Sequence, residues 1–262
     1  AVVKDILASG FLPEGSLQLI CGQIYDLIEQ LNPQDTVTFT GSAATGQSLR
    51  ANPHLNHYSI PFCMEADSVN SAILTEHAND ETINLFVREV FREMTTKAGQ
   101  KCTAIRRAFV PAALLETVQT RLVAKLQKVV VGDPEIEGVT MGALASVKQK
   151  FSVAEKVEQL SQDAKVVLGS HLRQDFEIQA KNVDKGAFYP PTLLVCEQPT
   201  QAQHIHEVEA FGPVSTLMPY QNLAELTDLV ARGEGSLVAS VVRNVDENIE
   251  ALITKIAPWH GR

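Results

Sequence analysis

The stretch Thr36-Val-Thr-Phe-Thr-Gly-Ser-Ala-Ala-Thr-Gly46 has the pattern of a strand, a turn and the start of a helix. Its first five residues are β-branched or aromatic, which favours a strand. Gly41-Ser42 then ends the strand, and residues 45–51 are typical of a helix. Short apolar runs alternate with amphipathic segments in the same way along the rest of the chain. This alternation predicts an α/β fold.

Further elements follow from the apolar periodicity and from the turn residues. We expect helices at residues 1–9, 24–31, 80–98, 114–126, 146–161, 223–231 and 245–256. We expect strands at residues 17–21, 58–64, 71–74, 104–110, 166–168, 214–220 and 237–242, and a proline-punctuated approach to a strand at 186–195. Ser146 is suited to cap the helix that follows it. The polar stretch Gly169–Lys185 has no periodicity and is predicted to be a surface excursion.

Length and charge limit the possible partners. The chain has 262 residues, enough for one large domain or two modest ones. Its net charge of −9 argues against a protein that works by neutralising phosphates. No apolar run approaches the roughly 20 residues that span a bilayer, and the first residues do not have the pattern of a signal peptide. We therefore expect neither a nucleic-acid partner nor a membrane partner.

The four cysteines are widely separated, at Cys21, Cys63, Cys102 and Cys196. No pair has the CxxC spacing, so the sequence indicates neither a disulfide framework nor a zinc site. This usage favours a reducing, cytoplasmic location. A lone cysteine is usually a small buried hydrophobe, and we expect that of three of the four.

Cys102 is the candidate nucleophile. It lies in Lys97-Ala-Gly-Gln-Lys-Cys-Thr-Ala104, after a predicted helix and before a predicted strand, which places it on a loop. A nearby positive charge favours the thiolate, the form that attacks a carbonyl carbon. Four cations are close in sequence: Lys97, Lys101, Arg106 and Arg107. The last two are otherwise expected to be a strand-face charge and a loop contact. The residues alone leave an unreactive cysteine as the alternative.

Glu65 is a candidate general base. It follows the apolar run Ile60-Pro-Phe-Cys-Met64, and a carboxylate at the end of such a strand would be partly desolvated. Desolvation raises the pKa of a carboxyl group and suits it to proton transfer. The alternative is an acid in solvent or at a helix cap.

Two further segments are candidate binding sites. Backbone amides that follow Gly41-Ser42 at the helix start suit a pyrophosphate, although an ordinary strand-to-helix turn explains the same residues. The segment matches neither GxGxxG nor a P-loop. His204 and His206 near Glu207 have the spacing of a metal pair on a strand. A solvent-exposed segment is the favoured interpretation, and no metal is expected.

Six segments, in this order, together resemble the aldehyde dehydrogenase superfamily. They are Phe39-Thr-Gly-Ser with Thr45-Gly46, Met64-Glu65, Gly99-Gln-Lys-Cys-Thr-Ala104, Val131-Gly-Asp-Pro134 with Met141-Gly142, Phe188-Tyr-Pro-Pro-Thr192 and Glu209-Ala-Phe-Gly-Pro-Val214. The resemblance covers essentially the whole chain. It implies an α/β catalytic domain at residues 65–262, preceded at residues 1–64 by the tail of a Rossmann-like dinucleotide-binding domain.

The resemblance also implies a reaction and a cofactor. Cys102 would form a thioester with an aldehyde, and Glu65 would activate the water that hydrolyses the thioester. The cofactor would be NAD or NADP, with Gly41 and Ser42 near its pyrophosphate. Glu209 would hold the nicotinamide ribose, and Phe211 would pack beside it. The substrate would be a small aldehyde.

One departure identifies a subgroup. The family usually continues its glutamate as Glu-Leu-Gly-Gly-Lys, whereas this chain has Glu65-Ala-Asp-Ser-Val69. Together with Gly99-Gln-Lys-Cys-Thr-Ala-Ile-Arg-Arg107, this variant resembles the dehydrogenase half of bifunctional ring-opening proteins of bacterial phenylacetate degradation. Those proteins carry a MaoC-like hydratase domain and oxidise a semialdehyde with NADP. The resemblance implies a CoA-linked semialdehyde as the substrate.

The chain is expected to be a fragment, because the family's upstream Pro-Trp-Asn segment and its C-terminal oligomer segment have no counterpart here. The full-length protein would be a homo-oligomer. Two alternatives remain beside the enzyme. The chain as it stands would be catalytically incomplete and bind no cofactor, or it would be a cysteine hydrolase that needs no nicotinamide. The segment Glu209-Ala-Phe-Gly212 argues against the hydrolase.

Overall fold

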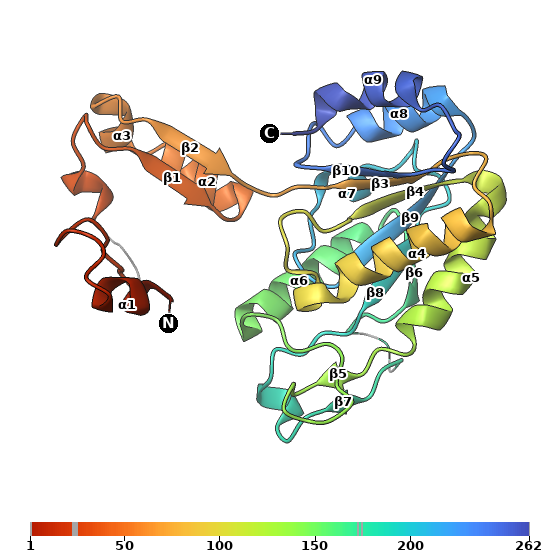
Figure 1. Ribbon diagram of the computed structural model, residues 1–262, viewed down its shortest axis with the longest axis horizontal. Coiled ribbons are helices and arrows are strands. Elements are labelled where there is room, and N and C mark those ends of the chain that lie inside the picture. The colour runs from red at the N-terminus through yellow and green to blue at the C-terminus, as the bar shows by residue number, and fades with distance from the viewer. Residues whose placement is uncertain (1, 23–25, 172, 174, 262) are drawn as a thin grey trace. The chain divides into compact units, whose positions relative to one another are not determined.

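The computed structural model describes residues 2–22, 26–171, 173 and 175–261 (Figure 1). The chain divides into two compact units, Ala1–Asp67 and Ser68–Arg262. The division falls slightly after residue 64, where the sequence places a domain boundary, and the assignment of the first unit to a cofactor domain stays a prediction. Across the described ranges, no helix combines the length and the apolar character needed to cross a bilayer.

The first unit is built on one β-α-β segment. Strands β1 (Val37–Thr40) and β2 (Phe62–Glu65) pair in parallel, with α2 (Ala43–Arg50) and α3 (Pro53–His57) between them in sequence. Helix α1 (Val2–Ala8) precedes them. The buried core of the unit is small and is formed by Ile28, Leu55 and Ile60.

Three expectations for this unit need correction. Residues 17–21 do not form a strand, because none of the described strands pairs with them, and Leu19 and Ile20 are exposed. The strand expected from residue 58 begins at Phe62, because Tyr58 ends the short helix Pro53–His57 and Ser59 has left-handed backbone at a φ of 53°. Of the helix expected at 24–31, residues 24 and 25 lie outside the described residues. The remainder contains only the 3₁₀ turn Ile28–Gln30.

The second unit is built on a six-stranded sheet with the order β10-β3-β4-β9-β8-β6. Its strands are β3 (Ser71–Leu74), β4 (Arg107–Pro111), β6 (Lys165–Leu168), β8 (Thr192–Val195), β9 (Val214–Tyr220) and β10 (Ala239–Val242). All neighbours are parallel except the antiparallel pair β6 and β8. The short strands β5 (Val131–Gly132) and β7 (Ile178–Gln179) pair separately.

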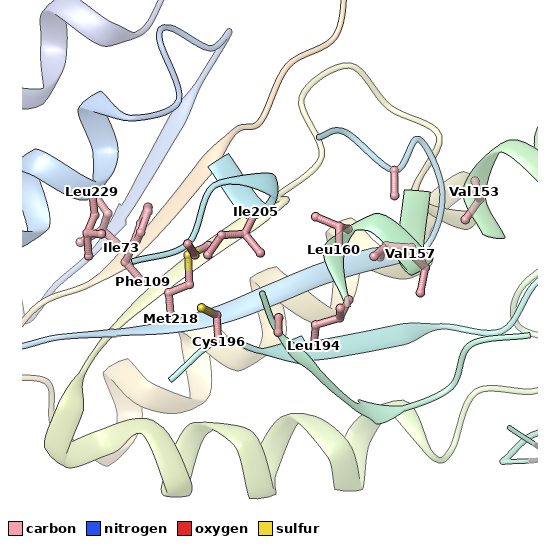
Figure 2. Packing of buried hydrophobic residues seen from close by; sticks show 14 of the residues in the cluster. Ile73, Phe109, Val153, Val157, Leu160, Leu194, Cys196, Ile205, Met218 and Leu229 are labelled. Atoms are coloured by element: carbon pink, nitrogen blue, oxygen red, sulfur yellow. The ribbon is translucent and has the colours of Figure 1, made fainter. Parts of the chain in front are cut away.

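Helices cover both faces of this sheet, which is why its central strands are apolar on both sides. The helices are α4 (Asp80–Thr95), α5 (Leu115–Leu126), α6 (Val147–Leu160), α7 (His204–Glu207), α8 (Leu223–Ala231) and α9 (Glu250–Ile256). In β4, Ala108 and Val110 pack with α4 and α5, which lie together in Figure 1. Phe109 points to the other face and belongs to the core cluster that also contains Val157 of α6 and Leu229 of α8, and Figure 2 shows it near Leu229.

Most elements of the second unit lie where the sequence predicts them, including α8 at 223–231 and the cap of α6, where the Ser146 hydroxyl accepts the Gln149 amide. The larger differences, of three residues or more, are at three boundaries. Helix α4 ends at Thr95, because the next residues turn into left-handed backbone. Strand β4 begins at residue 107 and α9 at residue 250. The excursion at 169–185 includes β7 and a 3₁₀ turn.

Arg107 is part of the core, although the sequence suggests a surface or loop charge. It is 1% exposed, and burial lowers its pKa to about 9. Its guanidinium donates to the carbonyl oxygens of Val69, Leu229 and Val230, at 2.9, 2.9 and 3.2 Å. The last two belong to the C-terminal turn of α8, where the helix dipole favours a cation. Arg107 therefore joins α8 to the start of the central strands β3 and β4.

His206 is the neutral partner of that guanidinium. Its Nδ1 lies 3.2 Å from Nη1 of Arg107, which can only donate, and its Nε2 lies 2.9 Å from the Pro199 carbonyl oxygen. The ring is therefore protonated on Nε2 alone. His206 is 3% exposed, so the expectation of a solvent-exposed segment at this position is wrong. Burial lowers the pKa of His206 to about 4.

This depressed pKa makes the stability of the fold depend on acid. An unfolded His206 binds a proton below about pH 6.5, whereas the folded one stays neutral down to about pH 4. The unfolded chain thus binds more protons in this window, and stability falls as the pH falls through it. We expect a loss of about 2 kcal/mol between pH 7 and pH 5. Urea unfolding of the protein and of H206Q at both pH values measures this loss.

The variant H206Q removes the titrating group and keeps an amide donor. Its free energy of unfolding should change less with pH than that of the unmodified protein. His260, whose pKa burial also lowers, remains in both proteins and contributes equally to each. An identical pH dependence in the two proteins would show that His206 is not the neutral core residue described above.

Candidate active site

Cys102 lies on the loop between α4 and β4, and its side chain is exposed. The loop begins with three residues of left-handed backbone, Lys97, Ala98 and Gly99, at φ of 53°, 51° and 68°. Gly99 is required there for a second reason. A Cβ at this position would lie 2.1 Å from the Gly212 carbonyl oxygen. The Cys102 loop therefore packs directly on the segment that contains Gly212.

Asn70 fixes the backbone of the nucleophile candidate. Its Nδ2 donates to the carbonyl oxygens of Cys102 and Ala104, at 2.8 and 3.1 Å. Its Oδ1 accepts from the Ser68 hydroxyl at 2.8 Å and from the Val238 amide at 3.1 Å. All the donors and two of the acceptor positions of this amide are thus in use, and the residue is 0% exposed. The Asn70 side chain therefore holds two carbonyl groups of the Cys102 loop.

Arg106 joins the Cys102 loop to the segment 209–213. Its Nη2 donates to the Gly99 carbonyl oxygen at 2.9 Å, and its Nη1 donates to that of Gly212 at 2.7 Å. Its Nε donates to Oε1 of Glu209 at 3.1 Å. Burial lowers the pKa of Arg106, and the charge of Glu209 opposes that effect. Arg106 is only 5% exposed, so it is a buried contact between two loops and not a charge on the face of a strand.

Glu209 and Phe211 lie beside this bridge. Oε2 of Glu209 accepts the Ser68 amide at 2.9 Å, and the residue is 9% exposed. The Phe211 ring is partly exposed, with the Arg106 guanidinium carbon 5.6 Å from its centroid. Gln149 of α6 holds the Phe211 carbonyl oxygen at 2.8 Å. The structure thus brings three predicted site residues, Cys102, Glu209 and Phe211, into connected segments of one unit.

Ser68 and Asn70 are site residues that sequence reasoning missed. The signal was present in the departure from Glu-Leu-Gly-Gly-Lys, since polar side chains stand where that motif continues. Ser68 is 4% exposed, and its hydroxyl accepts the Leu237 amide at 3.0 Å while it donates to Asn70. Ser68, which lies within the changed segment, and Asn70, which follows it, therefore form an internal network that supports the nucleophile loop.

Three of the four cations near Cys102 in sequence contact other groups. Nζ of Lys101 lies 2.7 Å from a carboxylate oxygen of Glu93. Arg106 pairs with Glu209, and the Arg107 guanidinium donates to backbone carbonyl groups of the core. The geometry therefore does not support Lys101, Arg106 or Arg107 as partners of the Cys102 thiol. The thiol depends instead on loop position and exposure.

The other cysteines also need a correction. Only Cys196 is buried, and burial raises the pKa of its thiol. Cys21 and Cys63 are exposed, whereas the sequence predicts three small buried cysteines. Exposure alone therefore does not distinguish Cys102 from these two, and the distinction is the hydrogen-bonded loop that holds it.

Glu65, Gly41 and Ser42 belong to the first unit. Glu65 is the last residue of β2, and its carbonyl oxygen accepts the Gly41 amide at 3.1 Å. Its side chain is exposed, so the expected partial desolvation is wrong. Ser42 caps α2, and its hydroxyl accepts the Thr45 amide at 3.4 Å.

The first turn of α2 is the place where the sequence resemblance puts the pyrophosphate of a dinucleotide cofactor. Oδ1 of Asp67 accepts the Ala43 amide at 3.2 Å, so an anionic oxygen already occupies part of this turn. The site must stay compact, because a Cβ at Gly41 would lie 2.5 Å from the Phe39 ring. Amides and the positive end of a helix dipole suit phosphate oxygens. Among the described residues, no group of three or more His, Cys, Asp or Glu side chains is arranged to hold a metal.

Known proteins are similar to this chain in sequence. The model of the aldehyde dehydrogenase family matches residues 1–257. A 3,4-dehydroadipyl-CoA semialdehyde dehydrogenase from Aromatoleum evansii is 41% identical over 263 residues, covering 100% of this chain and 51% of that protein. Protein MaoC from Klebsiella aerogenes is 39% identical over 123 residues, covering 47% of this chain and 34% of that protein.

Solved structures share the fold. Betaine aldehyde dehydrogenase from Staphylococcus aureus in complex with NAD+ has a TM-score of 0.81 at 21% identity, covering 97% of this chain and 48% of that one. An aldehyde dehydrogenase from Bartonella henselae has a TM-score of 0.77 at 22% identity, covering 98% and 51%. The chain spans about half the length of these structures and of the Aromatoleum relative. The predicted fold is confirmed, and the chain belongs to the aldehyde dehydrogenase family.

Proposed function

We propose that the protein containing this chain oxidises an aldehyde to a carboxylic acid, with Cys102 as the covalent nucleophile. The observation that carries this proposal is the hydrogen-bonded loop of Cys102. An exposed thiol stands on a loop whose carbonyl groups are fixed by Asn70 and Arg106. A nucleophile on a rigid scaffold is typical of covalent catalysis. Membership in the aldehyde dehydrogenase family supports the reaction class.

The first half of the reaction occurs at the Cys102 sulfur. The thiolate adds to the aldehyde carbon, so that a C–S bond forms and the carbonyl oxygen becomes an oxyanion. Backbone N–H groups of the Cys102 loop are proposed to stabilise this oxyanion. When bound, NAD or NADP supplies the acceptor for the hydride that leaves the former aldehyde carbon. Cys102 then carries the acyl group as a thioester.

The second half is hydrolysis, for which Glu65 is the proposed general base. The carboxylate takes a proton from water, the water oxygen attacks the thioester carbon, and the C–S bond breaks. The products are the carboxylic acid and the free Cys102 thiol. This role rests on the sequence resemblance, since Glu65 belongs to the first unit and Cys102 to the second. A retained glutamate favours transfer to water over transfer to coenzyme A.

Four residues are proposed to contact the cofactor. Gly41 and Ser42, at the start of α2, are proposed to meet the pyrophosphate. Glu209 is proposed to hold the nicotinamide ribose, with Phe211 packed beside it. Support comes from the buried anchoring of Glu209 and the partial exposure of Phe211.

The proposed substrate is a CoA-linked semialdehyde, and the proposed cofactor is NADP with NAD as the alternative. The support is the 41% identity to the 3,4-dehydroadipyl-CoA semialdehyde dehydrogenase of Aromatoleum evansii. A second candidate is that the 262-residue chain by itself is an inactive unit. The favouring observation is that it spans 51% of that relative.

An assay of reduced-nicotinamide formation distinguishes the proposed aldehyde oxidation from the inactive-unit alternative. The 262-residue chain and a full-length protein that contains it would each be given an aldehyde, with and without NADP. We expect turnover by the full-length protein only, and only with the cofactor. Turnover by the 262-residue chain would exclude the inactive-unit reading. Hydrolytic activity without cofactor, and no oxidation by the full-length protein, would contradict the proposed function.

A further inference from the structure

Arg106 contacts three groups that belong to two different parts of the proposed site. Its guanidinium donates to Gly99 in the Cys102 loop, and to Glu209 and Gly212 at either end of the neighbouring segment. Arginine can do this because its planar fork carries five N–H donors in fixed directions, whereas lysine offers a single point charge. One buried side chain therefore sets the spacing between the two segments.

The Cys102 loop has other supports that do not involve Arg106. Asn70 holds the carbonyl oxygens of Cys102 and Ala104. The Gln100 side chain accepts the Ala145 amide at 2.8 Å and donates to the Lys97 carbonyl oxygen at 3.0 Å. Loss of the Arg106 bridge should therefore leave the Cys102 loop largely in place. The greater effect should fall on the orientation of the Glu209 carboxylate.

We propose that Arg106 is a positioning residue that sets the Glu209 segment against the Cys102 loop and thereby sets where the nicotinamide is held relative to the thiol. This inference rests on the proposed function, in which Glu209 holds the nicotinamide ribose. Arg106 acts through Glu209 and Gly212 and does not itself touch the reacting atoms. It should matter for steps that need the cofactor and should matter less for steps that need only the thiol.

Two reactions of the full-length protein distinguish these steps. Aldehyde oxidation needs both the thiol and NADP. Acylation by p-nitrophenyl acetate needs only the thiol, because the sulfur attacks the ester carbon, the C–S bond forms, and nitrophenolate leaves with the electrons of the C–O bond. Binding of NADP, measured by titration calorimetry, is a third readout that is independent of turnover.

The test uses R106K, R106M and the matched control R121K. Arg121 also pairs with a carboxylate, that of Asp80, but on the exposed surface between α4 and α5. For R106K we expect NADP to bind about tenfold more weakly and kcat/KM for oxidation to fall by about tenfold or more. The rate of nitrophenolate release should change by less than about threefold. R121K should match the unmodified protein in all three.

The outcomes for R106K and R106M distinguish a positioning role from a purely structural one. R106K keeps the buried positive charge, so it remains informative if R106M fails to fold, and thermal unfolding identifies that case. A parallel loss of oxidation and acylation in folded R106K would overturn the positioning role, as would unchanged binding of NADP. If the unmodified protein neither binds NADP nor oxidises an aldehyde, the proposed function itself fails. That outcome is distinct from a failure confined to R106K.

Discussion

Replacing Cys102 by serine is expected to lower the rate of aldehyde oxidation by on the order of 10⁴-fold or more. A serine hydroxyl is almost wholly protonated at neutral pH and is a far weaker nucleophile than a thiolate. The loop should survive the change, since Asn70 and Arg106 hold its backbone and not the sulfur. The initial rate of reduced-nicotinamide formation by the full-length protein measures the effect.

The chain offers two matched controls. Cys21 and Cys63 are also exposed thiols, but both belong to the first unit, and Cys63 lies within strand β2. C21S and C63S should oxidise aldehyde at close to the unmodified rate. Loss of activity in C63S together with full activity in C102S would show that the wrong cysteine has been assigned.

Replacing Glu65 by glutamine is expected to separate the two halves of the reaction. Acylation of Cys102 does not need the base, so the first turnover should still produce reduced nicotinamide. Hydrolysis of the thioester should slow by about 10²- to 10⁴-fold, because general-base catalysis contributes that much. A stopped-flow trace should show a burst of about one equivalent per site, followed by a much slower steady rate.

The control for this variant is E29Q, which removes another exposed carboxylate from the same unit. It should show steady turnover at the unmodified rate, with no accentuated burst. If E65Q instead lost the burst and the steady rate equally, Glu65 would not be a base for hydrolysis alone. It would then have to act before or during the formation of the thioester.

Much of the fold follows from the sequence because its signals are local. Strand β1, the Gly41-Ser42 turn and the start of α2 lie within eleven consecutive residues, 36–46. Helix α4 shows a clear apolar face, and α8 matches its predicted range. These elements need only periodicity and cap residues to be recognised.

Errors occur where distant contacts decide the structure. The apolar run at 17–21 reads as a strand, but no described strand pairs with it. Helix α4 ends early because Gly99 must approach Gly212 more closely than any side chain allows. The partner of that glycine lies more than a hundred residues away along the chain, so local pattern could not show the need.

The candidate site divides in the same way. Cys102 and Glu65 were recognisable from ordered motifs, and Glu209 and Phe211 from the Glu-x-Phe-Gly-Pro segment. The sequence predicts that the adjacent Arg106 and Arg107 are a strand-face charge and a loop contact. Only the folded chain shows that Glu209, the partner of Arg106, lies beside it and that both are buried. The role of Asn70 is hidden for the same reason, because its hydrogen bond to Cys102 joins the segments that precede two different strands, β3 and β4.

The most direct test of the central claim is to observe the covalent intermediate on Cys102. Full-length E65Q would be mixed with NADP and an aldehyde, quenched in acid within the first turnover, digested and analysed by mass spectrometry. The account predicts an acyl group on the peptide that contains Cys102, at close to one equivalent, and none in E65Q/C102S. Oxidation of the aldehyde with no acyl group on Cys102, or with the label on Cys63, would contradict it.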